Sequence, residues 1–235
     1  MDKPAIEVDG IGKEFRIPNG LFRRRTVTAL KEVTFSVGRG EAFGLIGPNG
    51  SGKSTLLAIL STVLLPSSGR ARVGGISISE ENRIKPLIGV IPPDPRGFAW
   101  RSSAFQNLEF YAVLQNLPSL LIHRRIGELL EIVDLSPVKE RPIWTYSTGY
   151  LQRLNVARAL LRDPPILLFD EPSLGLDPWL ARSFRKWVRE ELIGRRKKTL
   201  LVATNQLDDV HQMCDRAALL EEGRLVWQGP AAEAA

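Results

Sequence analysis

Residues 47–55 read Gly-Pro-Asn-Gly-Ser-Gly-Lys-Ser-Thr and directly follow the apolar run 42–46. The nonapeptide fits the pattern G-x-x-x-x-G-K-[ST], a loop whose backbone N–H groups surround phosphate oxygens. A strand, a glycine-rich turn and a helix come in the order that this motif requires, which argues against a chance match. We therefore expect an α/β fold built around this unit and a chain that binds a nucleoside triphosphate.

Each part of the loop has a predicted task. The glycines allow a tight turn, and the helix that begins near Lys53 directs its positive dipole end toward the phosphates. Lys53 is predicted to reach the β- and γ-phosphates, and the Ser54 hydroxyl to bind Mg²⁺. The predicted nucleotide-binding loop comprises Gly47, Pro48, Asn49, Gly50, Ser51, Gly52, Lys53, Ser54 and Thr55.

A pair of carboxylates follows a second apolar run. Residues 166–169 read as a central parallel strand, and Asp170 and Glu171 come directly after it. Open α/β sheets bind ligands at the carboxyl ends of their strands. Asp170 is therefore predicted to hold Mg²⁺, and Glu171 to polarise a water for attack on the γ-phosphate. A mere cap on the helix after Pro172 is the alternative, and the upstream phosphate loop argues against it.

The length and the element pattern indicate one domain. The chain has 235 residues, of which 43% are hydrophobic, enough for one large α/β domain with a smaller helical lobe. Strands that alternate with helices predict a parallel sheet covered on both faces. We expect a single domain over 1–235, with a core of 1–92 and 164–235 and an inserted helical subdomain over about 93–163.

The net charge is +6, and two basic clusters stand out, at 23–25 and 195–198. Either could meet anionic lipid or nucleic acid. Neither has interleaved aromatic residues or a recognition motif, so a solvated loop and a solvated helix end are the favoured interpretation. No nucleic-acid partner is expected.

Targeting signals are not evident. No apolar run approaches the roughly 18–20 residues that span a bilayer, and the start lacks the charged-then-apolar order of a secretory signal. Cys214 is the only cysteine, which fits a reducing compartment. We expect a protein that stays inside the cell.

With these motifs in order, the chain resembles the ATP-binding subunit of ABC transporters. Residues 146–150, followed by Gln152 and Arg153, resemble the family's signature motif L-S-G-G-Q, with Ser147 and Gly149 kept. An ordinary serine helix cap is the alternative for Ser147. The resemblance implies a P-loop NTPase of RecA-like type, with a parallel-sheet core, an N-terminal antiparallel β part and an inserted helical subdomain.

The resemblance also implies cofactors and partners. ATP and Mg²⁺ are the expected cofactors, and ATP hydrolysis is the expected activity. Two chains would form a head-to-tail homodimer in which Ser147 and Gly149 of one grip the γ-phosphate held by the other. Residues 173–177 resemble the D-loop that connects the two sites. Phe15 lies where the family stacks an aromatic ring on adenine. Phe22 is the other candidate for this contact, and Phe15 as an ordinary core or surface residue is a further alternative.

Two positions depart from the family pattern. Pro93 stands in place of the Q-loop glutamine, and the next residue, Asp94, could supply an oxygen to Mg²⁺. Asn205 stands in place of the switch histidine and can donate a hydrogen bond to the γ-phosphate without a charge. The predicted catalytic residues are Glu171, Lys53 and Asn205. ATP binding is thus supported more strongly than fast hydrolysis.

Residues 96–101 and 107–111 resemble the drug- and polysaccharide-export branch of the family, which is ABC-2-like. The expected function is the motor subunit of an ABC exporter, peripheral on the cytoplasmic face of the membrane and partnered by separate membrane-spanning permease subunits. The alternative is a soluble ABC-type ATPase, or a slow ATP-dependent switch, that acts on nucleic acid or ribosomes. Such relatives join two ATPase halves in one chain or carry long insertions, and neither feature is found in this sequence.

Overall fold

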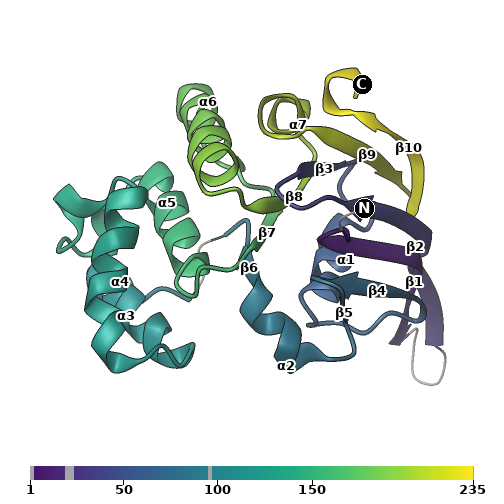
Figure 1. The fold of residues 1–235 in the computed structure, drawn as a ribbon. Coiled ribbons are helices and arrows are strands. Elements are labelled where there is room, and N and C mark those ends of the chain that lie inside the picture. Colours follow the sequence, from purple (N-terminus) through teal and green to yellow (C-terminus); the bar gives the residue numbers. More distant parts are fainter. Residues whose placement is uncertain (1–2, 19–23, 95–96, 235) are drawn as a thin grey trace.

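The protein is built on two β-sheets flanked by helices (Figure 1). The computed structural model describes residues 3–18, 24–94 and 97–234. Phe22 and Arg96, which the sequence analysis used, lie outside these residues. Within the described ranges, no helix combines the length and the apolar character that a bilayer crossing needs.

The larger sheet has six strands and carries the phosphate loop. Its strands are parallel except at one edge, where β10 runs antiparallel to β9. In spatial order they are β10 (Arg224–Pro230), β9 (Arg216–Glu221), β3 (Ala42–Ile46), β8 (Thr199–Thr204), β7 (Ile166–Asp170) and β6 (Ile88–Ile91). All residues of β3 are buried, as the apolar run 42–46 predicted, and all residues of β8 are buried as well. The parallel arrangement brings the carboxyl ends of β3, β7 and β8 to one edge.

The smaller sheet is antiparallel and confirms the expected N-terminal β part. Its order is β2 (Arg24–Val37), β1 (Ile6–Pro18), β4 (Ser68–Val73) and β5 (Ile76–Ser77). The sequence predicted only short strands at 6–8 and 34–37, but β1 and β2 pair as far as Pro18 and Arg24. The outer part of this hairpin was missed because its side chains are largely exposed and show no buried face.

Helix α1 (Lys53–Leu60) lies between the two sheets. Its buried residues share one hydrophobic cluster with both sheets; Leu56, Ile59 and Leu60 are fully buried there. On the other face of the large sheet, α6 (Pro178–Trp187) and α7 (Leu207–Met213) contribute to a second cluster. The sequence predicts a helix from Lys53 to Leu64, but α1 ends sooner, because Thr62 takes a left-handed φ of +64°. Short helical turns α2 (Glu81–Ile84) and η1 (Lys85–Leu87) precede β6.

Between β6 and β7 the chain forms a group of helices at the left of Figure 1. It contains α3 (Ala104–Leu114), α4 (Ser119–Ile132), η2 (Ser136–Val138), η3 (Ile143–Thr145) and α5 (Thr148–Ala159). Ser103 and Gln106 form a reciprocal cap at the start of α3. The predicted subdomain limits of 93 and 163 stay a prediction.

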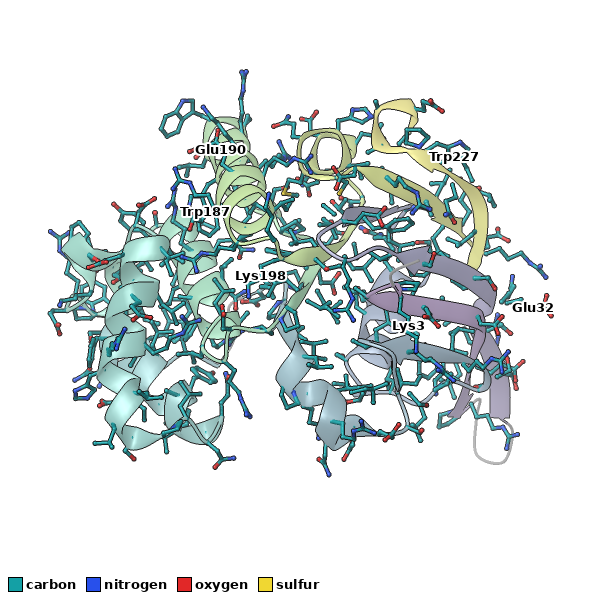
Figure 2. All side chains as sticks on the ribbon, viewed as in Figure 1. Lys3, Glu32, Trp187, Glu190, Lys198 and Trp227 are labelled. Carbon is teal, nitrogen blue, oxygen red and sulfur yellow. The ribbon has the colours of Figure 1, made fainter. Side chains whose placement is uncertain are left out.

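Trp187 joins this helical group to the rest of the molecule. It lies at the end of α6, facing the helical group (Figure 2). Its indole N–H donates to the Ile132 carbonyl at 3.2 Å, and the Arg153 guanidinium lies 5.5 Å from its ring centroid. After Trp187 the helix continues in a wider π-helical form, η4 (Val188–Arg195). One side chain thus contacts α4 and α5 together.

Two surface predictions need correction. The Ala-rich sequence from Pro230 predicts a frayed end, but η5 (Ala231–Glu233) forms there. Ala231 and Ala234 are buried because small side chains fit closely against the fold. The basic run 195–198 is not a simple solvated helix end. Lys198 is buried and pairs with Asp163 at 3.0 Å, and Arg195 and Arg196 both pair with Glu191.

Candidate active site

The phosphate loop between β3 and α1 curls around one buried ammonium group. Lys53 is 5% exposed and donates to the carbonyls of Gly47 at 2.8 Å and Pro48 at 3.1 Å. Gly52 has a φ of +113°, and a Cβ on Gly47 would come within 2.1 Å of the Leu220 carbonyl oxygen. The glycines at both positions are therefore required by backbone geometry, as the motif predicted.

An open pocket of about 230 Å³ adjoins the loop. It is lined by Ala29, Asn49, Gly50, Gly52, Lys53, Ser54, Thr55 and Glu171. Most of these residues belong to the predicted loop, and Glu171 comes from the end of β7, more than a hundred residues further along the chain. The pocket thus combines backbone N–H groups, one cation and one carboxylate at the carboxyl edge of the sheet, the composition of a site for phosphoryl transfer.

Ser54 and Asp170 form a pair of hard oxygen donors. The Ser54 hydroxyl donates to Asp170 Oδ1 at 3.1 Å. Burial raises the pKa of the Asp170 carboxyl, while the Ser54 hydrogen bond and the Lys53 charge act in the opposite direction. A desolvated carboxylate beside a hydroxyl is a donor set that suits Mg²⁺, which keeps several of its own waters and needs few protein ligands. The residues present therefore fit the expected cation.

Glu171 is held from two sides and by its own backbone. Its Oε1 lies 3.5 Å from Lys53 Nζ, and its Oε2 accepts the Asn205 backbone N–H at 3.1 Å. Its φ is +48°, a left-handed value that a non-glycine residue rarely takes. Its own N–H donates to the Ala203 carbonyl at 2.8 Å. Backbone strain of this kind concentrates at functional sites.

Asn205, which the resemblance aligns with the switch position, lies beside the phosphate loop. Its side-chain amide donates to Asn49 Oδ1 at 3.2 Å, and its side chain is exposed. The structure therefore brings Asn205 and Glu171 next to Lys53 and Asn49. An amide at this place can donate to a phosphate oxygen but brings no charge.

Other predicted site residues are not in the pocket. Within the described parts of the chain, the residues that line it do not include Phe15, Asp94, Ser147 or Gly149. Phe15 is half-buried in β1, with Lys13 Nζ 5.1 Å from its ring centroid. Ser147 caps α5 by accepting the Tyr150 N–H at 3.3 Å, so the cap that was weighed as the alternative is present. A site shared between two chains would still require an exposed Ser147, and it is exposed.

Further polar residues, which no sequence motif indicated, lie behind Glu171. Thr204 Oγ1 lies 3.4 Å from Glu171 Oε2 and donates to the buried Asp209 at 2.7 Å. Asp209 is fully buried and pairs with Arg185, which is 4% exposed. An acid in α7 and an arginine in α6 have no sequence signal that separates them from ordinary surface charges. The one sequence signal that could have indicated these residues is the position of Thr204, directly before Asn205.

The fold and this site together define an ATP-binding cassette. Residues 30–174 match the family model described as ABC transporter. The chain belongs to this family, and the resemblance inferred from the sequence is confirmed: it is an ATP-binding and ATP-hydrolysing subunit of the ABC transporter type.

Individual relatives support the assignment. The chain is 31% identical over 208 residues to the ABC transporter ATP-binding protein NatA of Bacillus subtilis, covering 88% of this chain and 84% of NatA. It is 32% identical over 231 residues to the Nod factor export ATP-binding protein I of Ralstonia nicotianae, covering 96% of this chain and 67% of that protein. Other relatives are longer, and the chain spans 59% to 62% of their length.

The solved structures agree on the fold. The structure of cbiO1 from Clostridium perfringens, described as part of the ABC transporter complex cbiONQ, superposes with a TM-score of 0.85 at 29% identity. That match covers 99% of this chain and 90% of cbiO1. The expected P-loop NTPase architecture is confirmed by this similarity.

Proposed function

We propose that this chain is the motor subunit of an ABC exporter, which works on the cytoplasmic face of a membrane and drives separate membrane-spanning subunits. The observation that carries the proposal is the convergence of Lys53, Ser54, Asp170 and Glu171 at one pocket of the phosphate loop. The export direction rests on relatives named for Nod factor export and for linearmycin resistance.

The residues divide the work of hydrolysis. Lys53 neutralises the β- and γ-phosphates, and the N-terminus of α1 adds its dipole. Ser54 and Asp170 would hold Mg²⁺, which supplies positive charge to the phosphate oxygens when bound. Glu171 orients and polarises the attacking water, and Asn205 donates to the γ-phosphate. Asp94 as a further metal ligand and Phe15 as the adenine platform stay predictions.

Two copies would complete each site. In this proposal, Ser147 and the N-terminus of α5 meet the γ-phosphate bound by the partner copy. Near the end of β7, Leu174 and Trp179 are 53% and 75% exposed, and they flank Asp177, which caps α6. Large apolar side chains so exposed favour a protein contact on this side of the molecule.

The membrane-spanning partner requires a second surface. A groove of about 560 Å³ runs between β6 and the helical group. It is lined by Lys85, Ile88, Gly89, Val90, Pro92, Tyr111, Leu114, Gln115, Asn116, Arg158, Ala159 and Arg162. We propose it as the docking groove for a cytoplasmic segment of the permease. Its lining residue Pro92 directly precedes Pro93, at the Q-loop position that the family resemblance links to that subunit. Val90 and Leu114 expose apolar surface in it.

Val90→Glu is expected to abolish co-purification with the permease while ATP affinity stays unchanged. A carboxylate pressed into an apolar contact should cost at least about 2 kcal/mol, roughly 30-fold in affinity. Val226→Glu is the matched control, because Val226 is also an exposed valine in a strand. The exposed fraction is 54% for Val226 and 40% for Val90, and Val226 lies on β10, away from the groove. Equal retention of the permease by both variants would exclude this groove.

The exporter proposal itself is tested by reconstitution. If a multi-span membrane protein is encoded beside its gene, the chain is co-expressed with that protein, and the complex is placed in lipid vesicles. We expect ATP-dependent phosphate release by the complex, stimulated by the membrane subunit. A purified chain that recovers no membrane subunit and instead copurifies with ribosomes or nucleic acid would favour the alternative function.

Asn205→His is expected to increase turnover. An imidazole can bring positive charge to the transition state, whereas the amide brings only a donor. Electrostatic donors of this kind are worth roughly 100- to 1,000-fold, and because the asparagine already donates, we expect a gain of about 3- to 30-fold. The measurement is steady-state phosphate release by the parent and the variant at saturating ATP. Unchanged turnover with intact ATP affinity would mean that another step, such as dimer opening, limits the rate.

A further inference from the structure

A buried polar cluster lies directly behind Glu171. Its members come from three stretches of the chain that meet beneath the carboxyl edge of the large sheet: the segment after β7, helix α6, and the stretch from the end of β8 into α7. They are Ser173 after β7, Arg185 in α6, Thr204 at the end of β8, Gln206 in the following turn and Asp209 in α7. Gln206 is half-buried and the other four are between 0% and 4% exposed. We call this group the Asp209 cluster.

Asp209 is the centre of the cluster. Its Oδ1 accepts hydrogen bonds from Arg185 Nε and Ser173 Oγ, both at 2.6 Å, and its Oδ2 accepts from Thr204 Oγ1 at 2.7 Å. Arg185 Nη2 also donates to Gln206 Oε1 at 2.9 Å. The buried carboxylate therefore has three donors, one cation and two hydroxyls. A buried ion pair such as Arg185–Asp209 adds little net stability compared with apolar packing. We therefore consider what the pair does for the orientation of the groups bonded to it.

The Thr204 hydroxyl can donate only one hydrogen bond, and two carboxylates lie within reach of it. Asp209 Oδ2 lies at 2.7 Å and Glu171 Oε2 at 3.4 Å, so the proton goes to Asp209. The Thr204 oxygen in turn accepts the Gln206 backbone N–H at 3.1 Å. The turn 204–206 is thereby fixed at both ends. Between them, the Asn205 N–H is directed at Glu171 Oε2.

The same carboxylate also fixes the chain after Glu171. Ser173 follows Glu171 by two residues, and its hydroxyl donates to Asp209. Asp209 thus anchors the two segments that determine where Glu171 points: its own continuation toward the D-loop and the turn that donates to its Oε2. No atom of the cluster lines the nucleotide pocket.

We infer that Asp209, held by Arg185, is a positioning residue for ATP hydrolysis: it fixes the turn 204–206 and the segment 171–173 so that Glu171 is aimed at the attacking water. This inference rests on the proposed role of Glu171. It predicts a specific kinetic signature, because the phosphate loop that binds ATP is not part of the cluster. Turnover should fall while ATP affinity is kept.

Thr204→Val is the first test, since valine keeps the shape and removes the hydroxyl. We expect kcat to fall about 10-fold, a fraction of the 10²- to 10⁴-fold that an oriented base contributes. The KM for ATP, and the Kd from calorimetric titration, should stay within about twofold. Thr204→Ser restores the hydroxyl and should return kcat to within about twofold of the parent. Equal loss of kcat and affinity in the valine variant, or no rescue by serine, would overturn the inference.

Asp209→Asn is the second test, with Asp163→Asn as its matched control. Asp163 also pairs with a buried cation, Lys198, whose side chain is 8% exposed, but it has no contact with the Asp209 cluster among the bonds described. We expect the kcat loss only in the Asp209 variant, and thermal melts of both variants measure the stability cost separately.

Glu171→Gln, measured in parallel, separates the positioning role of Asp209 from the proposed role of Glu171. If that variant is inactive while Thr204→Val and Asp209→Asn turn over like the parent, the positioning role is wrong and the role of Glu171 stands. If Glu171→Gln hydrolyses ATP at the parental rate, the proposed role of Glu171 is wrong, and the inference fails with it.

Discussion

Lys53→Ala is expected to remove useful ATP binding. Lys53 is the cation of the pocket, and its ammonium is already oriented by the carbonyls of Gly47 and Pro48. Losing a charge-assisted contact to phosphate should cost about 1.5–3 kcal/mol, roughly 10- to 150-fold in Kd. The loss also leaves Glu171 without its neighbouring cation, which adds repulsion toward the phosphates. Isothermal titration with ATP measures the change directly.

The control for this variant is Lys186→Ala. Lys186 is an exposed lysine of α6 whose partner is Glu190 at 3.9 Å. Its removal should leave ATP affinity unchanged, since surface ion pairs contribute little and none of its described contacts reaches the pocket. Because Lys53 is buried, a thermal melt of the alanine variant must accompany the titration. A folded Lys53→Ala protein with parental affinity would contradict the assignment of the phosphate loop.

Glu171→Gln is expected to stop hydrolysis while ATP is still bound. Glutamine keeps the shape and can still accept the Asn205 N–H, but it cannot act as a base or polarise water as strongly. Loss of an oriented base should lower turnover by roughly 10²- to 10⁴-fold. In the proposed head-to-tail dimer, unhydrolysed ATP should hold two copies together. Size-exclusion chromatography with Mg-ATP is then expected to show a shift from monomer to dimer.

Glu191→Gln is a closely matched control for this substitution. The Glu191 side chain is 14% exposed against 13% for Glu171, and its partners are Arg195 and Arg196, at the far end of η4. It should neither slow hydrolysis nor trap a dimer. A Glu171→Gln protein that stays monomeric and hydrolyses ATP at the parental rate would count against both the role of Glu171 and the dimer.

Much of the fold could be predicted because its signals are local. The unbroken apolar runs at 42–46 and 166–169 predicted buried parallel strands, and both are present as β3 and β7. The sequence also predicts a helix over 207–213, and α7 has these bounds. In the site, the spacing of the phosphate loop specified Lys53 and Ser54, and the end of an apolar strand specified Asp170 and Glu171. These residues meet because parallel strands end at one edge.

What the sequence could not predict depends on contacts between distant segments. The burial of Lys198 depends on Asp163, and the packing of the Ala-rich tail depends on α7, where His211 Nε2 lies 3.0 Å from the Ala234 carbonyl oxygen. The Arg185–Asp209 pair joins two helices that look amphipathic or polar on their own. Hydrophobic periodicity reports which face of an element is buried, but not which charged residue finds a partner inside.

The left-handed backbone at Glu171 has a consequence for how this protein could evolve or be engineered. A non-glycine residue at a φ of +48° stores strain of order 1 kcal/mol or more. Glycine or asparagine would relieve part of it, so the chain should become more stable by losing the carboxylate that we propose for hydrolysis. Selection for heat resistance alone would then favour inactive proteins at this position. A screen for robust variants of this chain should therefore score ATP turnover together with melting temperature.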